Sequence, residues 1–312
     1  MRDVDHNLKE SQASCPGMPD TVMLMEVGPR DGLQFEKKIL PTPLKVELIT
    51  DLVEAGLQEI QVASFVSPGI VPQMADADTL VAQLPKRAGV VYNGLVLNVK
   101  GVERAAAAGL KSVEISISAS EAHSRRNVNM TLKEAKGQAV DMIRLSRELD
   151  LAVRAGIQCA FGFSDDEAIP FERIQRMVED FMEEGIEILC LSDTTGMADP
   201  VKIDTIMEKL CPLVGDLDMA LHLHDTRGLG LVNVQAALQY GIRHFDASLA
   251  GMGGCPFVPG AAGNIATEDL VNFLHSLHIQ TSVDIQKLAR CSRRLETFFE
   301  KRFSGRMHRL MV

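Results

Sequence analysis

Two histidines separated by a single residue stand out among the side chains that could do chemistry. His222 and His224 close an apolar run that is expected to be a strand, and Asp225 follows directly. Alternate side chains of a strand point to the same face, so both imidazoles can reach one ion. A single strand histidine is more often a core residue, but the order His-Leu-His-Asp favours a metal site.

Oxygen donors for such an ion follow two other predicted strands. Asp31 lies in a Gly/Pro-bounded segment after an early strand, and Asn264 lies shortly after the last one. Imidazole nitrogens combined with carboxylate and amide oxygens, with room left for water, favour Mg²⁺ or Mn²⁺ over structural zinc. The expected cofactor is therefore a divalent cation, Mg²⁺ or Mn²⁺, and its expected ligands are Asp31, His222, His224 and Asn264.

Arg30, next to the predicted ligand Asp31, could serve the same chemistry. A guanidinium keeps its proton near pH 7 and can stabilise a developing enolate oxygen while the adjacent carboxylate binds the cation. A surface ion pair is the common role of an Arg-Asp dipeptide, but a position at the end of a strand favours the catalytic interpretation.

Cys255 lies in the glycine-rich segment Gly251–Pro256. Glycines permit unusual backbone conformations and allow a segment to move, so the thiol could be a proton donor on a lid. A small, inert cysteine beside a turn is an equally good interpretation, and the pattern does not choose between the two.

These residues must be positioned by a repeated strand and helix pattern. Eight short apolar runs are expected to be strands: Val22–Val27, Glu59–Phe65, Val90–Leu97, Ser112–Ser118, Ala152–Ala160, Ile186–Leu191, Met219–His224 and His244–Leu249. A stretch with helical spacing follows each run, for example Leu44–Ala55 and Leu132–Leu149. Strands that alternate with helices predict a parallel sheet.

Eight such units favour a closed (β/α)8 TIM barrel over an open doubly wound sheet. The nucleotide-binding pattern G-x-G-x-x-G of many open sheets is absent after the first strand. The predicted organisation is a flexible leader over 1–20, a catalytic barrel over 21–282 and a C-terminal helical extension over 283–312. In such a barrel the active site lies at the carboxyl ends of the strands, where the polar motifs occur.

Charge and composition exclude several classes of protein. The chain of 312 residues has a net charge of −10 and no Trp, which argues against binding nucleic acid. No apolar run approaches the length of about 20 residues that spans a bilayer, and no secretory leader precedes the scattered cysteines. We expect a cytoplasmic protein with a small-molecule substrate and neither nucleic acid nor membrane as partner.

At its polar segments the sequence resembles the 3-hydroxy-3-methylglutaryl-CoA (HMG-CoA) lyase family, a group of metal-dependent TIM-barrel enzymes. The resemblance runs roughly from Val22 to Leu288 and rests on five segments: Glu26–Gln34, Ser64–Met74, His222–Thr226, Gly251–Pro256 and Gly263–Leu270. It implies the four metal ligands above, an enolate-stabilising arginine at Arg30, a lid thiol at Cys255 and a further active-site aspartate at Asp193. Barrels of this group are often homo-oligomers, dimers or larger.

The sequence departs from this family at the predicted mouth. The family usually has a glutamate where this chain has Gln61, and an amide can neither accept a proton nor balance Arg30 as a carboxylate can. Arg227 stands where an aromatic residue is common, and it is either a contact for a substrate carboxylate or a surface arginine. The predicted substrate-binding residues are Arg30, Gln34, Gln61, Ser64 and Arg227.

The resemblance implies cleavage of the C2–C3 bond of a 3-hydroxyacyl-CoA, with HMG-CoA giving acetyl-CoA and acetoacetate. Citramalyl-CoA lyase, which releases pyruvate, is the alternative substrate assignment. A barrel that binds metal and CoA without cleavage is a second alternative, motivated by Gln61, and Gln61→Glu would then create activity. Condensation in the reverse direction is a third.

Overall fold

Eight parallel strands form a closed barrel in the computed structural model, which describes residues 17–164, 167–254, 258 and 262–311. The strands are β1 (Met23–Glu26), β2 (Glu59–Ser64), β3 (Val91–Val96), β4 (Ser112–Ser118), β5 (Ala152–Gln158), β6 (Ile188–Ser192), β7 (Asp218–His222) and β8 (His244–Ala247). Each strand pairs with the next, and β1 pairs with β8 to close the ring. The prediction of a TIM barrel is therefore confirmed.

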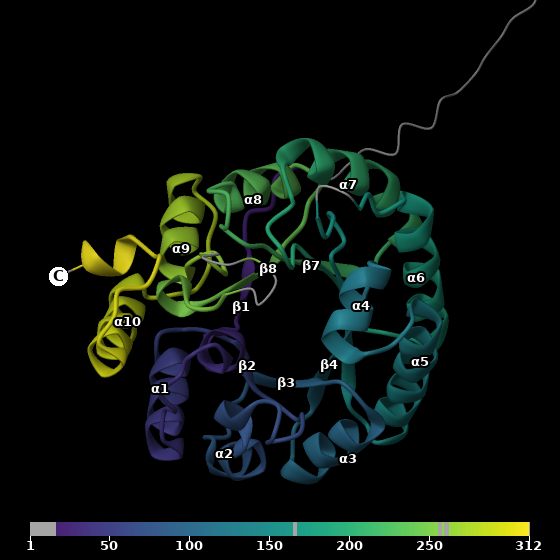
Figure 1. Ribbon diagram of the computed structural model, residues 1–312. Coiled ribbons are helices and arrows are strands. Elements are labelled where there is room, and N and C mark those ends of the chain that lie inside the picture. The colour runs from purple at the N-terminus through teal and green to yellow at the C-terminus, as the bar shows by residue number, and fades with distance from the viewer. Residues whose placement is uncertain (1–16, 165–166, 255–257, 259–261, 312) are drawn as a thin grey trace, which may run out of the picture.

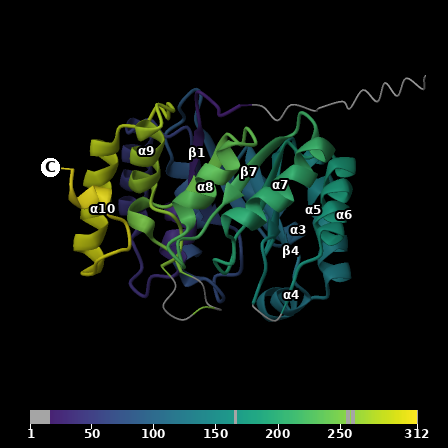
Figure 2. The same ribbon diagram turned by 90° about the horizontal axis from the view of Figure 1, so that it is seen from above.

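Helices surround this barrel, as Figure 1 shows. They are α1 (Thr42–Glu54), α2 (Ala77–Gln83), α3 (Val99–Ala108), α4 (Glu121–Val128), α5 (Leu132–Glu148), α6 (Phe171–Glu184), α7 (Pro200–Val214), α8 (Gly230–Leu238), α9 (Thr267–Ser276) and α10 (Ile285–Phe299). Four short helical turns complete the described elements: η1 (Gly28–Gly32), η2 (Pro72–Met74), η3 (Leu249–Gly251) and η4 (Met307–Arg309). In the side view of Figure 2, α4 lies at one end of the molecule, beyond the strand β4 that it follows.

Local sequence signals explain where several of these elements begin and end. Thr131 and Glu134 form a reciprocal capping box at the start of α5, which satisfies backbone N–H groups that the first turn leaves open. Gly109 ends α3 in the left-handed conformation that glycine adopts without strain. The strands are buried on both faces because helices cover them, so they read as apolar runs.

The C-terminal helix α10 confirms the predicted helical character of the extension, and it packs beside α1. The backbone N–H of Asp284 donates to the carbonyl of Ala55 at 2.7 Å, and Lys287 donates to the carbonyl of Glu54 at 2.9 Å. Arg294 pairs with Glu47 and Asp51 on α1. The proposed division of the chain near residues 20 and 282 remains a prediction. Among the described residues, no helix is both long and apolar enough to cross a membrane.

Candidate metal and acyl-CoA site

Arg30 and Asp31 are positioned by the short turn η1, which follows β1. Glycine and proline at the borders of this segment are typical of a loop, but the backbone N–H of Asp31 donates to the carbonyl of Val27 at 2.6 Å and the segment winds into one π-helical turn. Pro29 suits this start, because its fixed φ is helical and the first N–H groups of a helix lack partners. Both charged side chains are buried in the turn.

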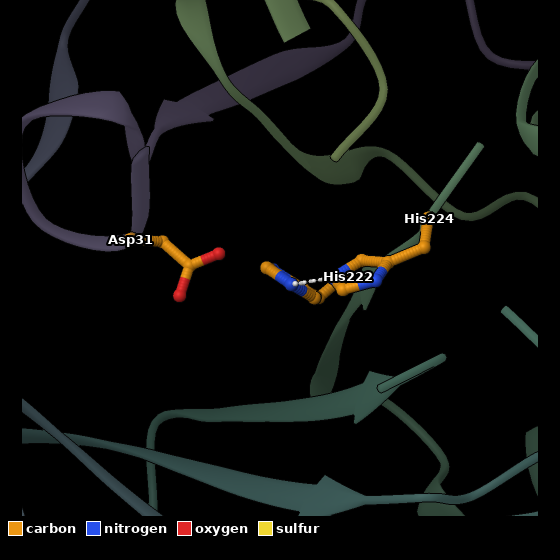
Figure 3. A group of neighbouring side chains, drawn as sticks. All are labelled: Asp31, His222 and His224. Carbon is orange, nitrogen blue, oxygen red and sulfur yellow. Dashed lines mark hydrogen bonds between the residues drawn. The ribbon is translucent and has the colours of Figure 1, made fainter. Parts of the chain in front are cut away.

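The two histidines meet at the end of β7. The strand ends at His222, whereas the sequence pattern predicted an end at His224. Beyond the strand, an isolated β-bridge pairs His224 with Asn264. Their Nε2 atoms lie 3.2 Å apart. Figure 3 shows both rings and the Asp31 carboxylate facing one another, and their ligand atoms lie within 4.8 Å of one another.

Asn264 joins this group through Asp31. Its Nδ2 donates to Asp31 Oδ2 at 2.7 Å and to the carbonyl of Met252 at 3.0 Å. The backbone of Gly253 crosses directly over this amide, since a Cβ on Gly253 would lie 2.5 Å from Asn264 Nδ2. Asp31, His222, His224 and Asn264 are called the ligand cluster below.

Burial and neighbouring charges set the protonation of the ligand cluster. Burial favours a neutral Asp31, but the adjacent Arg30 guanidinium and the histidines outweigh it and lower the pKa of Asp31. Burial, together with the charge of His222, lowers the pKa of His224 to about 3, so this imidazole is neutral. Burial opposes a charged His222, yet the hydrogen bond and charge of Asp246 raise the pKa of His222.

The ligand cluster fits a divalent cation. Asn264 Oδ1 and His224 Nδ1 are buried and have no hydrogen-bond partner among the described residues. An unpaired buried carbonyl oxygen costs about 1–3 kcal/mol, which ligation of a cation would offset. The two Nε2 atoms face each other at 3.2 Å, and ligation of a cation by both rings would replace this direct contact.

Arg30 is held between Asp31 and Gln61. Its Nε donates to Gln61 Oε1 and its Nη1 donates to Asp31 Oδ1. The described residues offer no hydrogen-bond acceptor to Nη2. One edge of the guanidinium is therefore fixed by the protein, and the remaining nitrogen is free for a ligand.

The other predicted residues lie around this group at different depths. Gln34 donates to Asp31 Oδ1 at 3.0 Å, whereas the buried Ser64 Oγ has no partner within the described part of the chain. Arg227 is exposed and donates to the carbonyl of Gly196, so it links the loops after β6 and β7. Cys255 lies outside the described residues.

Asp193 follows β6 and is 1% exposed. Its Oδ1 accepts the backbone N–H of Ala198 at 2.9 Å, and its backbone N–H donates to the carbonyl of His222 at 2.8 Å. Oδ2 is buried without a hydrogen-bond partner among the residues described. Burial raises the pKa of Asp193 to about 6, against the lowering effect of the backbone hydrogen bonds.

The sequence reasoning missed the residues that support this site from inside the barrel. Asp246 on β8 accepts from His222 Nδ1 at 3.1 Å and from Arg154 on β5 at 2.6 Å. Arg154 also faces Glu114 on β4 at 3.4 Å. A usable signal existed, because charged residues inside strands that are otherwise apolar must have buried partners.

The fold and site define the class of protein: a TIM barrel with a buried metal-ligand cluster at the carboxyl ends of its strands. The chain belongs to the HMGL-like family, whose model matches residues 21–295.

Curated and solved relatives agree with this membership. The chain is 41% identical over 278 residues to the mitochondrial hydroxymethylglutaryl-CoA lyase of Rattus norvegicus, covering 89% of this chain and 86% of the relative. The crystal structure of Bacillus subtilis HMG-CoA lyase matches with a TM-score of 0.91 and 36% identity, over 95% of this chain and 99% of that one. An Acinetobacter baumannii HMG-CoA lyase in complex with coenzyme A and 3-methylmalate matches with a TM-score of 0.88 and 36% identity, over 93% and 95%.

Proposed function

We propose that this protein is a divalent-cation-dependent lyase that cleaves HMG-CoA to acetyl-CoA and acetoacetate. The observation that carries the proposal is the ligand cluster, whose open donors lie beside the fixed guanidinium of Arg30 in a barrel of the HMGL-like family. The relatives named above, which act on HMG-CoA by name, support the choice of substrate.

The reaction breaks the C2–C3 bond of the acyl group. When bound, the cation supplies Lewis acidity to the oxygens of a chelating 3-hydroxyacyl group. The buried Asp193 accepts the proton of the 3-hydroxyl on Oδ2, which the protein leaves open. The electron pair of that O–H bond forms the new ketone, and the pair of the C2–C3 bond passes to the thioester as an enolate.

Arg30 holds the enolate charge through its open Nη2 while Gln61 and Asp31 fix its other nitrogens. We assign to Cys255 the proton that C2 takes up to give acetyl-CoA. We also assign Ser64 and Gln34 as polar contacts of the bound acyl group. Arg227, at the rim, is assigned as the contact of a substrate carboxylate.

Product analysis tests the proposal. The purified chain, loaded with Mg²⁺ or Mn²⁺ and mixed with HMG-CoA, is expected to release acetyl-CoA and acetoacetate in equal amounts. A protein that binds the cation but releases neither product contradicts the proposed function.

Citramalyl-CoA is the second candidate substrate, and cleavage would give acetyl-CoA and pyruvate. Gln61 in place of the usual glutamate favours an altered substrate, and the Acinetobacter baumannii relative was solved with 3-methylmalate, a diacid with a four-carbon backbone. Pyruvate from citramalyl-CoA without acetoacetate from HMG-CoA would move the assignment to this candidate.

The setting of the reaction is also a proposal. We infer a cytoplasmic location from the scattered cysteines, which are typical of a reducing compartment. We infer a homo-oligomer, a dimer or larger, because barrels of this group often form one. Light scattering of the purified chain tests the assembly, and a mass of one chain, 34.1 kDa, contradicts it.

A further inference from the structure

A layer of polar side chains lies inside the strands that carry the ligand cluster. TIM-barrel interiors are filled mostly by bulky branched residues, and a charged layer departs from that pattern. Asp246 of this layer hydrogen-bonds His222, and Gln61 hydrogen-bonds Arg30, so the layer meets the site at two points. We call this group the strand layer; its members are Gln61, Asn93, Glu114, Arg154 and Asp246.

The orientation of the Gln61 amide is fixed by this layer. Gln61 is fully buried, and its Nε2 donates to Glu114 Oε2 at 2.8 Å and to Asn93 Oδ1 at 3.0 Å. A flipped amide would set its oxygen against two acceptors. The oxygen must therefore face Arg30 Nε, which needs an acceptor.

Glu114 is the carboxylate on which this arrangement depends. It is 5% exposed and reaches from β4 across β3 to Gln61 on β2. Gly156 on β5 borders it, since a Cβ there would lie 2.5 Å from Ser116 Oγ and 3.3 Å from Glu114 Oε1. Arg154 Nε, 3.4 Å from Oε2, balances its charge.

We propose that Glu114 is a positioning residue for Arg30 that acts through the Gln61 amide and supplies from β4 the carboxylate usual for the family at position 61. The proposal rests on the proposed function, because Arg30 matters only if its charge meets a substrate. Gln61 is then part of a rearranged network, and its lack of charge does not mean that the site is inactive.

Under this arrangement Gln61→Glu lowers activity, whereas the alternative of a barrel that binds without cleavage expects Gln61→Glu to create activity. In that variant two buried carboxylates would face each other at the present 2.8 Å contact, and only one of them could keep a charge without a large cost. Glu114→Gln removes the second carboxylate. In the double variant Gln61→Glu/Glu114→Gln an amide again faces a carboxylate, and Arg154 keeps Asp246 at 2.6 Å.

A double-mutant cycle tests the proposal. Gln61→Glu is expected to lower kcat by about 10- to 100-fold, with KM for the acyl-CoA changed less than about threefold, because Arg30 is misplaced while the substrate pocket is intact. Glu114→Gln is expected to lower kcat less, and the double variant to recover to within about threefold of the parent chain. Gln83→Glu, the same substitution at an exposed position on α2, is expected to change nothing.

Thermal unfolding supplies a readout that does not depend on catalysis. Gln61→Glu is expected to lower Tm by about 5 °C or more, and the double variant to regain most of that loss. Mn²⁺ affinity of the double variant should equal that of the parent chain, since no ligand is changed.

Two results would overturn the proposal: a rise in kcat in Gln61→Glu alone, or a double variant no better than Gln61→Glu in both kcat and Tm. A parent chain that cleaves no acyl-CoA contradicts the proposed function instead. In that case the Tm values of the two single variants and the double variant test the coupling of residues 61 and 114. Additive losses of Tm would reject that coupling.

Discussion

The ligand cluster and the strand layer are both buried and polar, but they differ in how completely their atoms are bonded. In the ligand cluster, Asn264 Oδ1 and His224 Nδ1 have no hydrogen-bond partner among the described residues. In the strand layer, Arg154 Nε is the only side-chain atom that is buried without a hydrogen-bond partner among the described residues, and it faces Glu114 at 3.4 Å. Open polar atoms are costly unless a ligand fills them, whereas a satisfied network fixes side chains in place. We infer from this difference that the ligand cluster takes part in the reaction and that the strand layer orients it.

Removing a residue of the ligand cluster should have the largest effect. His222→Ala is expected to abolish stoichiometric Mn²⁺ binding and to lower kcat by more than about 100-fold. This loss exceeds the roughly 10- to 100-fold effect of removing a residue that only orients a metal ligand. Metal analysis after dialysis and a cleavage assay measure both. His244→Ala, at the other end of the barrel on β8, is the matched control and should keep metal and activity. Full activity in His222→Ala would reject the site.

Substitution of Arg30, which contacts both the ligand cluster and the strand layer, should have the second largest effect. Arg30→Lys keeps the charge but cannot donate to Gln61 and Asp31 together while leaving a third nitrogen for substrate, so kcat is expected to fall by about 100-fold. Metal content should remain near one per chain. Equal loss of metal would make Arg30 a support of the ligand cluster rather than a contact of substrate. Arg104→Lys, in the peripheral pair with Asp78, is the control.

A change in the strand layer should act through the histidine that it touches. Asp246→Asn weakens the hydrogen bond to His222 Nδ1 and is expected to reduce Mn²⁺ affinity by about 10- to 100-fold, measured by calorimetry. Asp218→Asn alters a looser His–Asp pair at 3.9 Å, in which the aspartate is exposed, and should leave affinity unchanged. If both variants bind equally well, the strand layer does not orient the ligand cluster.

The smallest effect concerns Glu26, a buried carboxylate that supports η1. It accepts from the backbone N–H groups of Gly28 and Leu249 and from the Thr267 hydroxyl, and burial raises the pKa of Glu26 to about 8 despite these bonds. A raised folded-state pKa gives stability that is complete below the unfolded value of 4.5 and is lost as pH rises through 8.

Glu26→Gln should flatten this dependence. The amide oxygen can keep both backbone N–H groups, and the Thr267 hydroxyl can accept from the amide nitrogen. Urea unfolding at pH 6 and pH 9 is expected to show a smaller loss of stability in the variant than in the parent chain. If the free energy of unfolding falls equally between pH 6 and pH 9 in the variant and in the parent chain, Glu26 is not the cause of the loss.

The predictable part of this molecule was the part encoded by local pattern. Alternating apolar runs and helical spacing predicted all eight strands, because parallel barrel strands are buried on both faces. The His-Leu-His order predicted two imidazoles that do meet, although β7 ends at His222 and a bridge to Asn264, rather than the strand, extends His224.

The strand layer was not predictable in the same way. Glu114 hydrogen-bonds Gln61 across β3, and Asp246 hydrogen-bonds Arg154, which lies 92 positions earlier in the sequence. Such contacts depend on barrel register, which no local pattern encodes. The sequence shows that Gln61 lacks the charge of the usual glutamate, but only the structure shows that its amide is hydrogen-bonded to Arg30, Asn93 and Glu114.

Coupled measurement of bound cation and product tests the central claim most directly. Metal-stripped protein is titrated with Mn²⁺ in the presence of HMG-CoA, and bound ion and acetoacetate are measured in the same samples. Acetoacetate formation should rise in proportion to bound Mn²⁺ and stop rising at one ion per chain. Product formed by the metal-stripped protein, or one bound ion per chain without acetoacetate, would contradict the claim that the ligand cluster holds the cation that cleavage requires.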